Sequence, residues 1–102
     1  MGIKLYVDDL RRCPDGWELA RTNTDAIRIL ATGIVDTISL DHDIVFEKEG
    51  GHFISNENFQ PVAYYLALMK DRPSVLFHTA NIEMGRRMSE IIGCEFDYWG
   101  FE

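Results

Sequence analysis

The stretch Ser39-Leu40-Asp41-His42-Asp43 is the most informative part of the sequence for both fold and function. It ends a β-like run, Val35 to Leu40, that delivers two carboxylates and an imidazole where we expect a strand to stop. Short apolar runs bounded by polar residues are typical of strands inside an α/β sheet. The stretch therefore predicts a buried strand with reactive side chains at its carboxyl end.

Two other strand-like runs end in the same way. Ile3–Val7 opens into Asp8-Asp9, and Ser74–Phe77 opens into His78-Thr79-Ala80-Asn81. In an open α/β sheet, ligands bind at the edge formed by the carboxyl ends of the strands. The sequence therefore predicts one polar site at this edge.

Helical patterns separate these strands. They run from Thr22 to Gly33, over Val62–Lys70, and from Asn81 to Gly93. Thr22 and Asp25 resemble a capping box, and a glycine ends the first and the third helix. The 62–70 segment is apolar nearly all round, which predicts a well-buried helix.

The remaining segments complete the predicted sheet. Trp17–Arg21 and Cys94–Tyr98 alternate as strands, and Val45–Glu47 and His52–Ile54 flank Glu49-Gly50-Gly51 as a hairpin or flap. Strands separated by helices pair in parallel through right-handed crossovers. Residues 8–16 are too short for a crossover helix, and no helix follows the last predicted strand. We expect a small, truncated, mostly parallel five-stranded α/β sheet of the flavodoxin type, with about three helices and a flap hairpin.

Composition and charge limit the classes of function. A chain of 102 residues predicts a single domain, residues 1–102, with one core. The net charge of -7 argues against duplex DNA, because duplex binding rests on many Lys and Arg neutralising phosphates. Cys13 and Cys94 are too few for a disulfide scaffold or a zinc cluster, so we expect reduced thiols. We find neither a targeting segment nor the roughly 18 apolar residues of a membrane span, so we expect a cytoplasmic protein with no membrane contact.

Four aspartates follow two of the predicted strands. They are Asp8 and Asp9 after the first run, and Asp41 and Asp43 in the central stretch. Hard divalent cations prefer carboxylate oxygens and often sit between a few acids and a substrate's phosphates. The alternative is that such aspartates merely begin loops or cap helices, which explains one aspartate better than two pairs. We therefore expect the four residues to bind a divalent cation, magnesium or manganese.

Two histidines at the same edge are candidates for proton transfer. His42 and His78 each follow a predicted strand, and imidazole is the natural proton carrier near neutral pH. The alternative is a core histidine bonded to a backbone carbonyl. Along a strand the ring of His42 points away from the carboxylates of Asp41 and Asp43. We therefore expect His78 to be the main proton carrier and His42 the lesser one.

Arginines supply the positive charge that a phosphate needs. Arg11 lies in the loop after Asp9, and Arg87 lies in the helix after Asn81. Guanidinium groups bind phosphate oxygens bidentately, and the free N–H groups at a helix start form a second anion site. The alternative for any single arginine is a solvated surface residue. We expect Arg11 and Arg87 to contact a ligand.

With these residues in view, the chain resembles the cyclic-phosphate-processing receiver-like domains of bacteria and phages. The resemblance is carried by Val7-Asp8-Asp9-Leu10-Arg11 with Pro14, Gly16-Trp17, Arg21-Thr22 before Ala26-Ile27, Ser39-Leu40-Asp41-His42-Asp43, and His78-Thr79-Ala80-Asn81 with Gly85 and Met88. It spans nearly the whole chain. It implies a response-regulator receiver fold that keeps the acidic pocket and lacks some flanking helices.

The resemblance also implies roles for single residues. Asp8 and Asp9 match the acidic pair that holds the receiver metal. Asp41 falls at the phospho-accepting aspartate, and Thr79 lies near the receiver's hydroxyl residue. A receiver also has a lysine at the end of its last strand, and residues 94–102 contain none. Ordinary phosphoryl signalling is therefore not expected, and His78 with the arginines would supply the missing charge.

These observations lead to three hypotheses of function. The first is a metal-dependent phosphoesterase, a hydrolase that opens a cyclic phosphate in RNA end processing or in nucleotide signalling and anti-defence. In it, the acids hold the cation, Asp41, His42 and His78 are catalytic, and the phosphate is held by Arg11, Thr79, Asn81 and Arg87. The second is a non-catalytic binder or sponge of a phosphorylated nucleotide, and the third a degenerate receiver that works through protein contacts. The expected partner is a small phosphorylated nucleotide or an RNA end, and the sequence leaves a homodimer open.

Overall fold

The computed structural model describes residues 2–48 and 51–99. In chain order the elements are β1 (Ile3–Val7), β2 (Glu18–Ala20), α1 (Asn23–Leu30), β3 (Val35–Leu40), β4 (Asp43–Lys48), β5 (Gly51–Asn58), α2 (Gln60–Leu68), β6 (Ser74–Phe77) and α3 (Ile82–Ile92). Within the described ranges, no helix has the length and apolar character needed to cross a membrane.

Four parallel strands form the main sheet, in the order β2-β1-β3-β6. Their last residues are in register, because Val7 pairs with Ala20 on one side and with Leu40 on the other, and Leu40 pairs with Phe77. The carboxyl ends of all four strands therefore meet at one edge. This order is that of flavodoxin-like sheets, so the α/β prediction is confirmed.

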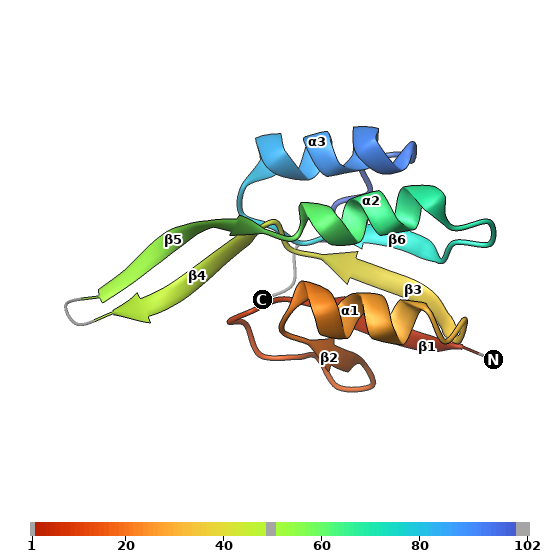
Figure 1. Cartoon of the computed structure of the whole chain (residues 1–102), viewed down its shortest axis with the longest axis horizontal. Helices are drawn as coiled ribbons and strands as arrows, with labels where there is room; N and C mark the ends of the chain where they lie inside the picture. The colour runs from red at the N-terminus through yellow and green to blue at the C-terminus, as the bar shows by residue number, and fades with distance from the viewer. Residues whose placement is uncertain (1, 49–50, 100–102) are drawn as a thin grey trace.

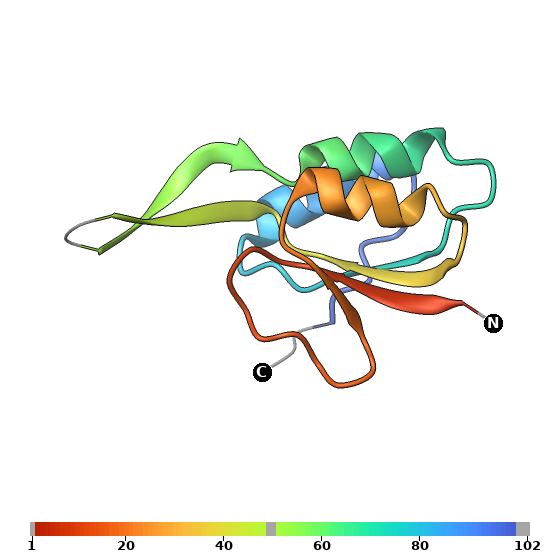
Figure 2. The same ribbon diagram turned by 60° about the horizontal axis from the view of Figure 1, so that its bottom comes forward.

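All three helices lie side by side on one face of the sheet (Figures 1 and 2). The crossovers from β2 to β3 and from β3 to β6 run in the same direction, so right-handed connections place α1 and α2 on the same face. Leu5, Ile38 and Phe77 are fully buried in the core between sheet and helices. The core therefore lies on one side of the sheet.

Aromatic rings cover the face of the sheet that carries no helix. Tyr6 alternates with the core residues Leu5 and Val7, so its side chain points to the other face. There its ring stacks on His78, with centroids 4.2 Å apart, and meets the edge of Trp17 at 6.1 Å. Trp17 in turn stacks on Trp99 at 5.1 Å. The connection from β1 to β2, which is too short for a helix, thus contributes part of an aromatic cover instead.

The cap predictions are confirmed. Thr22 Oγ1 accepts a hydrogen bond from the Asp25 backbone N–H at 3.1 Å, and α1 begins at the next residue. Asn81 Oδ1 accepts from the Met84 N–H at 3.2 Å and caps α3. Gly93 ends α3 with a φ of 83°, in the left-handed region that glycine enters without strain.

The fifth strand that alternation predicts over residues 94–98 is not confirmed. In the described part of the chain, Tyr98 makes one isolated parallel bridge to Phe77. Two backbone hydrogen bonds flank that bridge, from the Phe77 N–H to Asp97 O at 2.9 Å and from the Trp99 N–H to Phe77 O at 2.6 Å. Local alternation is present, but the segment stays beside β6 too briefly to form a strand.

The prediction that the second helix is well buried is wrong for its outer face. Tyr64 is 55% exposed and Leu68 is 85% exposed, whereas Val62 and Leu66 are fully buried. Apolar residues all round a helix favour burial only where a further layer covers it. α2 lies between α1 and α3 in the only helical layer described, so one side of it faces solvent.

The predicted hairpin is confirmed as the antiparallel pair β4–β5, and its turn residues Glu49 and Gly50 lie outside the described residues. It projects from the sheet, as Figure 1 shows. Its base is fixed where Asp43 pairs with Asn58 and where the Phe59 N–H donates to His42 O at 2.9 Å. The hairpin therefore starts directly at the edge that carries the polar residues.

Candidate functional site

Three carboxylates meet between the ends of β1 and β3. One oxygen each from Asp8, Asp9 and Asp41 lies within 4.8 Å of the others, so the three could hold a metal ion. The chain leaves β1 toward β2 on one side and returns to β3 on the other, so this gap is the topological switch point at which such sheets bind ligands. A cavity of about 170 Å³ opens there, and Asp43 and Thr79 also line it.

Asp8 is buried and accepts four hydrogen bonds. Its Oδ1 accepts from the backbone N–H groups of Leu10 and Arg11, each at 2.8 Å. Its Oδ2 accepts from Arg11 Nη1 at 3.0 Å and from His78 Nε2 at 2.9 Å. Burial alone would raise the pKa of Asp8, but these bonds outweigh it and lower the pKa to about 2. Asp8 is therefore a fixed negative charge.

The environment of Asp41 shifts its pKa in the opposite direction to that of Asp8. Its Oδ1 accepts from the His42 N–H at 2.8 Å, while its Oδ2 lies 3.6 Å from Arg11 Nη1. Burial and then the negative charge of Asp8 raise the pKa of Asp41. Two carboxylates this close need additional positive charge, and Arg11 already provides part of it.

The carboxylate cluster fits a divalent cation by its donor chemistry. All three candidate ligands are carboxylate oxygens, which Mg²⁺ and Mn²⁺ prefer over nitrogen or sulfur. Burial raises the pKa of Asp41 most and the charge of Asp8 raises it further, so a bound cation would relieve the second of these effects. Asp8, Asp9 and Asp41 could therefore hold such an ion together.

His78 is buried behind the cluster and does not line its cavity. Its Nε2 donates to Asp8 Oδ2 at 2.9 Å, and its Nδ1 lies 2.7 Å from Ser39 Oγ. Its side chain is 1% exposed, and Tyr6 stacks on the ring. Burial and then the charge of Asp8 raise the pKa of Tyr6 to about 12, so Tyr6 stays neutral beside it. Both ring nitrogens of His78 are thus engaged inside the protein.

His42 orients Asp43 at the wall of the cavity. The prediction that the ring of His42 points away from the carboxylate of Asp43 is wrong, because His42 lies between β3 and β4, where strand alternation does not hold. His42 Nδ1 lies 2.7 Å from Asp43 Oδ1, and Gln60 Nε2 lies 3.1 Å from His42 Nε2. An amide NH₂ can only donate, so this pattern places the imidazole proton on Nδ1, from where it is donated to Asp43. Asn81 Nδ2 approaches both oxygens of Asp43 at 3.4 Å. Asp43, whose side chain is 26% exposed, is therefore held from two sides.

The structure brings two of the four predicted phosphate ligands, Arg11 and Thr79, to this cavity, and neither Asn81 nor Arg87 belongs to its lining. Arg11 and Thr79 line it, and Thr79 Oγ1 accepts from the Asn81 N–H at 3.0 Å. Asn81 uses its side chain to cap α3 and to contact Asp43. Arg87 is exposed on α3 and is not among the residues that line the cavity, so its ligand contact stays a prediction.

The sequence analysis predicted no role in the site for three residues that support it. Ser39 bonds His78, and Gln60 bonds His42 from the start of α2. Arg21 Nη1 donates to Arg11 O at 2.9 Å and approaches Asp8 O at 3.5 Å, which ties the loop after β1 to the end of β2. Strand alternation could have paired Ser39 with Asp41 on one face. Gln60 gave no signal, because its partner is 18 residues away.

Comparison with known proteins gives one match. The family model described as "Cyclic-phosphate processing Receiver domain" matches residues 3–93, from β1 to the end of α3. No curated protein and no solved structure matches the chain. The matched range contains every carboxylate, histidine and arginine of the site.

Proposed function

Because the chain belongs to the family of cyclic-phosphate processing receiver domains, we propose that it is a metal-dependent phosphoesterase acting on the cyclic phosphate of a nucleotide or an RNA end. The observation that carries the proposal is the cluster of Asp8, Asp9 and Asp41 at the switch point, beside the guanidinium of Arg11 and the hydroxyl of Thr79. Phosphoryl transfer needs mainly positioning and neutralisation of charge, which these groups can supply.

The size of the cavity supports a phosphate-sized occupant. Its volume of about 170 Å³ compares with roughly 30 Å³ for each water in the liquid. A cation and a phosphate group fit in such a space, whereas drug-sized ligands occupy about 300–1,000 Å³. The acidic cavity is therefore suited to the reacting group and not to a whole nucleotide.

The chain's own residues take separate parts in the proposed reaction. Asp8, Asp9 and Asp41 would hold the cation, which when bound neutralises phosphoryl charge as a Lewis acid. Arg11 and Thr79 orient the phosphate oxygens. Water adds to phosphorus and one ester P–O bond of the ring breaks, which leaves a phosphate monoester.

Proton transfer is assigned to the cavity wall. Asp43 takes the proton from the attacking water and returns it to the departing alkoxide, and His42 behind it stabilises each charge state of the carboxyl group. His78 would have to give up its bonds to Asp8 and Ser39 to reach a substrate. We therefore propose that His78 acts through Asp8, as a positioning residue.

The test is a substrate panel with and without cation. Nucleoside 2′,3′-cyclic phosphates, cyclic dinucleotides and RNA ending in a 2′,3′-cyclic phosphate are incubated with Mg²⁺, Mn²⁺ or a chelator. We expect a monoester product that requires the cation and disappears in an Asp9→Asn, Asp41→Asn double variant. Asp36→Asn, an exposed aspartate of β3, is the matched control and should retain activity. Turnover that survives the double variant would contradict the proposal.

A non-catalytic nucleotide binder is the second candidate, and one observation favours it. Neither histidine offers a free ring nitrogen to the cavity, since the side chains of His42 and His78 are 6% and 1% exposed and their ring nitrogens are engaged. If the protein is such a binder, calorimetry would show tight binding of one of the cyclic phosphates or cyclic dinucleotides. No product would form with Mg²⁺, with Mn²⁺ or in a chelator. Phosphorylation of Asp41 by a small phosphodonor would instead identify a degenerate receiver.

A further inference from the structure

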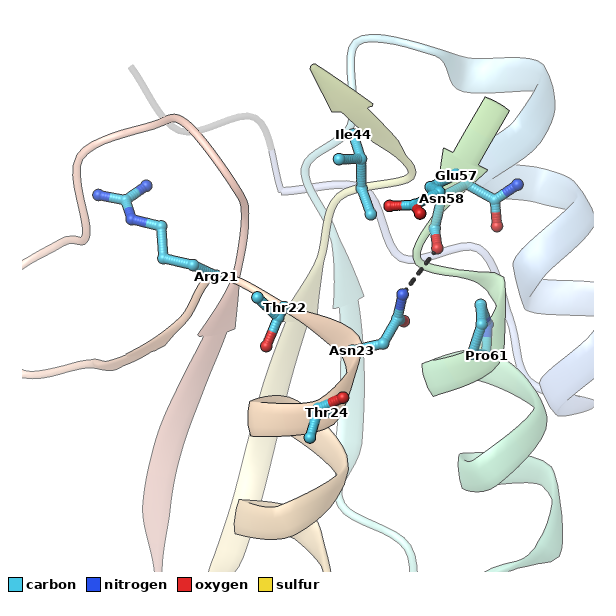
Figure 3. A pocket seen from close by; sticks show the side chains of 8 residues that line it. All are labelled: Arg21, Thr22, Asn23, Thr24, Ile44, Glu57, Asn58 and Pro61. Carbon is cyan, nitrogen blue, oxygen red and sulfur yellow. Dashed lines mark hydrogen bonds between the residues drawn. The ribbon is translucent and has the colours of Figure 1, made fainter. Parts of the chain in front are cut away.

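A second and larger cavity opens next to the acidic one. Its volume is about 540 Å³, and it lies between the start of α1 and the base of the β4–β5 hairpin (Figure 3). Thr22, Asn23 and Thr24 form one wall, and Ile44 and Glu57 belong to the other. We infer that this cavity binds the nucleoside portion of a ligand whose phosphate lies at the carboxylate cluster. The inference rests on the proposed function of that cluster.

The two cavities are neighbours on one edge of the sheet. Ile44 lines the larger cavity, and the preceding residue, Asp43, lines the acidic one. Arg21 also lines the larger cavity and extends toward the loop after β1, where its Nη1 lies 3.5 Å from Asp8 O. A ligand would have to pass Asp43 and the backbone near Arg21 to extend from the acidic cavity into the larger one.

The volumes of the two cavities match the two parts of a nucleotide. At about 540 Å³ the larger cavity is within the usual range for small-molecule sites, and at about 170 Å³ the acidic cavity is below it. A base with its ribose needs the larger space. A phosphate with a cation needs only the smaller one.

The lining of the larger cavity fits a nucleoside better than a second phosphate. Ile44 and Pro61 offer aliphatic surface to a planar base, as such sites usually do. The carboxylate of Glu57 lies at the wall and would repel a phosphate. Arg21 also belongs to the lining, and its Nη1 donates to Arg11 O at 2.9 Å. The occupant should therefore be at least partly apolar.

Asn23 provides a polar group of fixed orientation. Its Nδ2 donates to Asn58 O at 2.9 Å, which pins the amide between α1 and the hairpin base (Figure 3). Its Oδ1 is buried and has no hydrogen-bond partner among the described residues. Buried acceptors are normally satisfied, and an N–H of a base or an O–H of a ribose is a suitable donor.

The test compares cyclic phosphates with and without a nucleoside. Calorimetry is performed in Mn²⁺ on an Asp43→Asn background, which lacks the proposed proton acceptor and therefore does not consume the ligand. It measures the Kd of adenosine and guanosine 2′,3′-cyclic phosphate and of ethylene phosphate, a five-membered cyclic phosphate with no base or sugar. We expect at least one nucleoside compound to bind about 10-fold or more tightly than ethylene phosphate, a difference of the size that one good additional contact provides.

A filled cavity provides the control. Thr24→Phe narrows the larger cavity from an exposed position on α1, and Arg28→Phe adds the same side chain one turn later, outside the lining. We expect Thr24→Phe to remove the advantage of the nucleoside while ethylene phosphate binds as before, and Arg28→Phe to change neither. Asn23→Leu, with folding checked by its Tm, should weaken only the nucleoside compounds.

The outcomes separate this inference from the proposed function. If the nucleosides bind no better than ethylene phosphate, or if Thr24→Phe leaves their advantage intact, the larger cavity is not their site and the phosphate site stands. If no cyclic phosphate binds at all, the proposed function fails and the inference fails with it.

Discussion

Asp8 and Asp41 face each other across the ends of β1 and β3, and their surroundings shift their pKa values in opposite directions. Asp8 accepts hydrogen bonds from Arg11 and His78, whereas burial and the neighbouring charge dominate at Asp41. The fold stabilises the charged form of Asp8, whereas it destabilises the charged form of Asp41. Such a pair is typical of a site arranged for a ligand and not for stability.

The two aspartates should therefore respond differently to neutralisation. In a chelator, Asp41→Asn should raise the Tm, because it removes repulsion and keeps an oxygen for the His42 N–H. Asp8→Asn should lower the free energy of unfolding by about 2 kcal/mol, because it loses a carboxylate whose pKa is reduced from 3.8 to about 2. Thermal melts of both variants test this, and a destabilised Asp41→Asn would contradict the account of Asp41.

Cation binding should appear as a gain in stability. An ion that binds only the folded state raises the Tm as its concentration increases. We expect Mn²⁺ to stabilise the wild type and the Asp36→Asn control, and to have no effect on an Asp9→Asn, Asp41→Asn double variant. An equal shift in the double variant would place the ion elsewhere.

The pH dependence follows from the same pair. The folded state lowers the pKa of Asp8, so its contribution is fully present above the ordinary value of 3.8 and is lost as the pH falls toward about 2. The pKa of Asp41 is raised, so its protonation on acidification relieves repulsion and has the opposite sign. In metal-free buffer, Asp8→Asn should lose less stability between about pH 4 and 2 than the wild type does. Denaturant unfolding at several pH values measures this, and parallel curves for the two proteins would refute it.

At the scale of elements, α3 packs unusually close to the loop after β6 and to the segment that follows α3. A Cβ added at Gly85 would lie 2.8 Å from Thr79 Cγ2 and 2.8 Å from Phe96 Cε1. Helix propensity alone favours alanine over glycine by about 1 kcal/mol. At Gly85 this preference is outweighed by the close contacts with Thr79 and Phe96, because overpacking costs about 1–3 kcal/mol.

Gly85→Ala should therefore destabilise the protein and also displace Thr79 at the acidic cavity. Glu90→Ala, at an exposed position of the same helix, should change the free energy of unfolding by less than about 0.5 kcal/mol. Denaturant titrations compare the two variants. A stabilising Gly85→Ala would show that α3 can move away from Thr79 and Phe96 without loss.

Local signals explain which elements could be predicted from the sequence. Thr22, Asn81 and Gly93 set helix ends through their own side chains or backbone freedom, so they were visible without the fold. The exposure of Leu68 and the reduction of the fifth strand to a bridge at Tyr98 depend on which layers are present. The hydrophobic periodicity of a segment does not show whether another helix or strand packs against it.

At the scale of the whole molecule, the described part of the sheet has helices on one face (Figure 2). Aromatic rings lie on the other face. Trp17 contacts Tyr6 and Trp99, and Lys4 Nζ lies 5.8 Å from the centre of its ring. The rings shield the buried pair of His78 and Ser39 from water. The aromatic rings therefore cover this face of the sheet, as helices cover the other face.

Removal of the cover should be costly. Trp17→Ala should lower the free energy of unfolding by about 2 kcal/mol, less than for a fully buried tryptophan because Trp17 is half-buried. Tyr64→Ala, on the open face of α2, removes an aromatic ring that is 55% exposed and should have an effect within about 0.5 kcal/mol. Equal effects in the two variants would mean that Trp17 does not stabilise the sheet.

The candidate site was predictable only in part, for reasons of whole-molecule geometry. Asp8, Asp9 and Asp41 follow strands, and register at the strand ends brings them together. Arg87 depends on the rotation of α3 about its axis, which the sequence does not determine. His78 follows its strand as expected, but Tyr6, from the other end of the chain, covers its ring. Burial of a strand-end residue depends on the opposite layer and not on its own neighbours.

The stack of Trp17 on Trp99 also has an optical consequence. These are both tryptophans of the chain, so all of its indole emission arises from one pair of rings 5.1 Å apart. Tyr6 touches that pair and His78, and His78 bonds Asp8. A change of charge at Asp8 therefore alters the electric field at the indoles. The protein's own fluorescence and near-ultraviolet circular dichroism should follow Mg²⁺ titration without any attached dye.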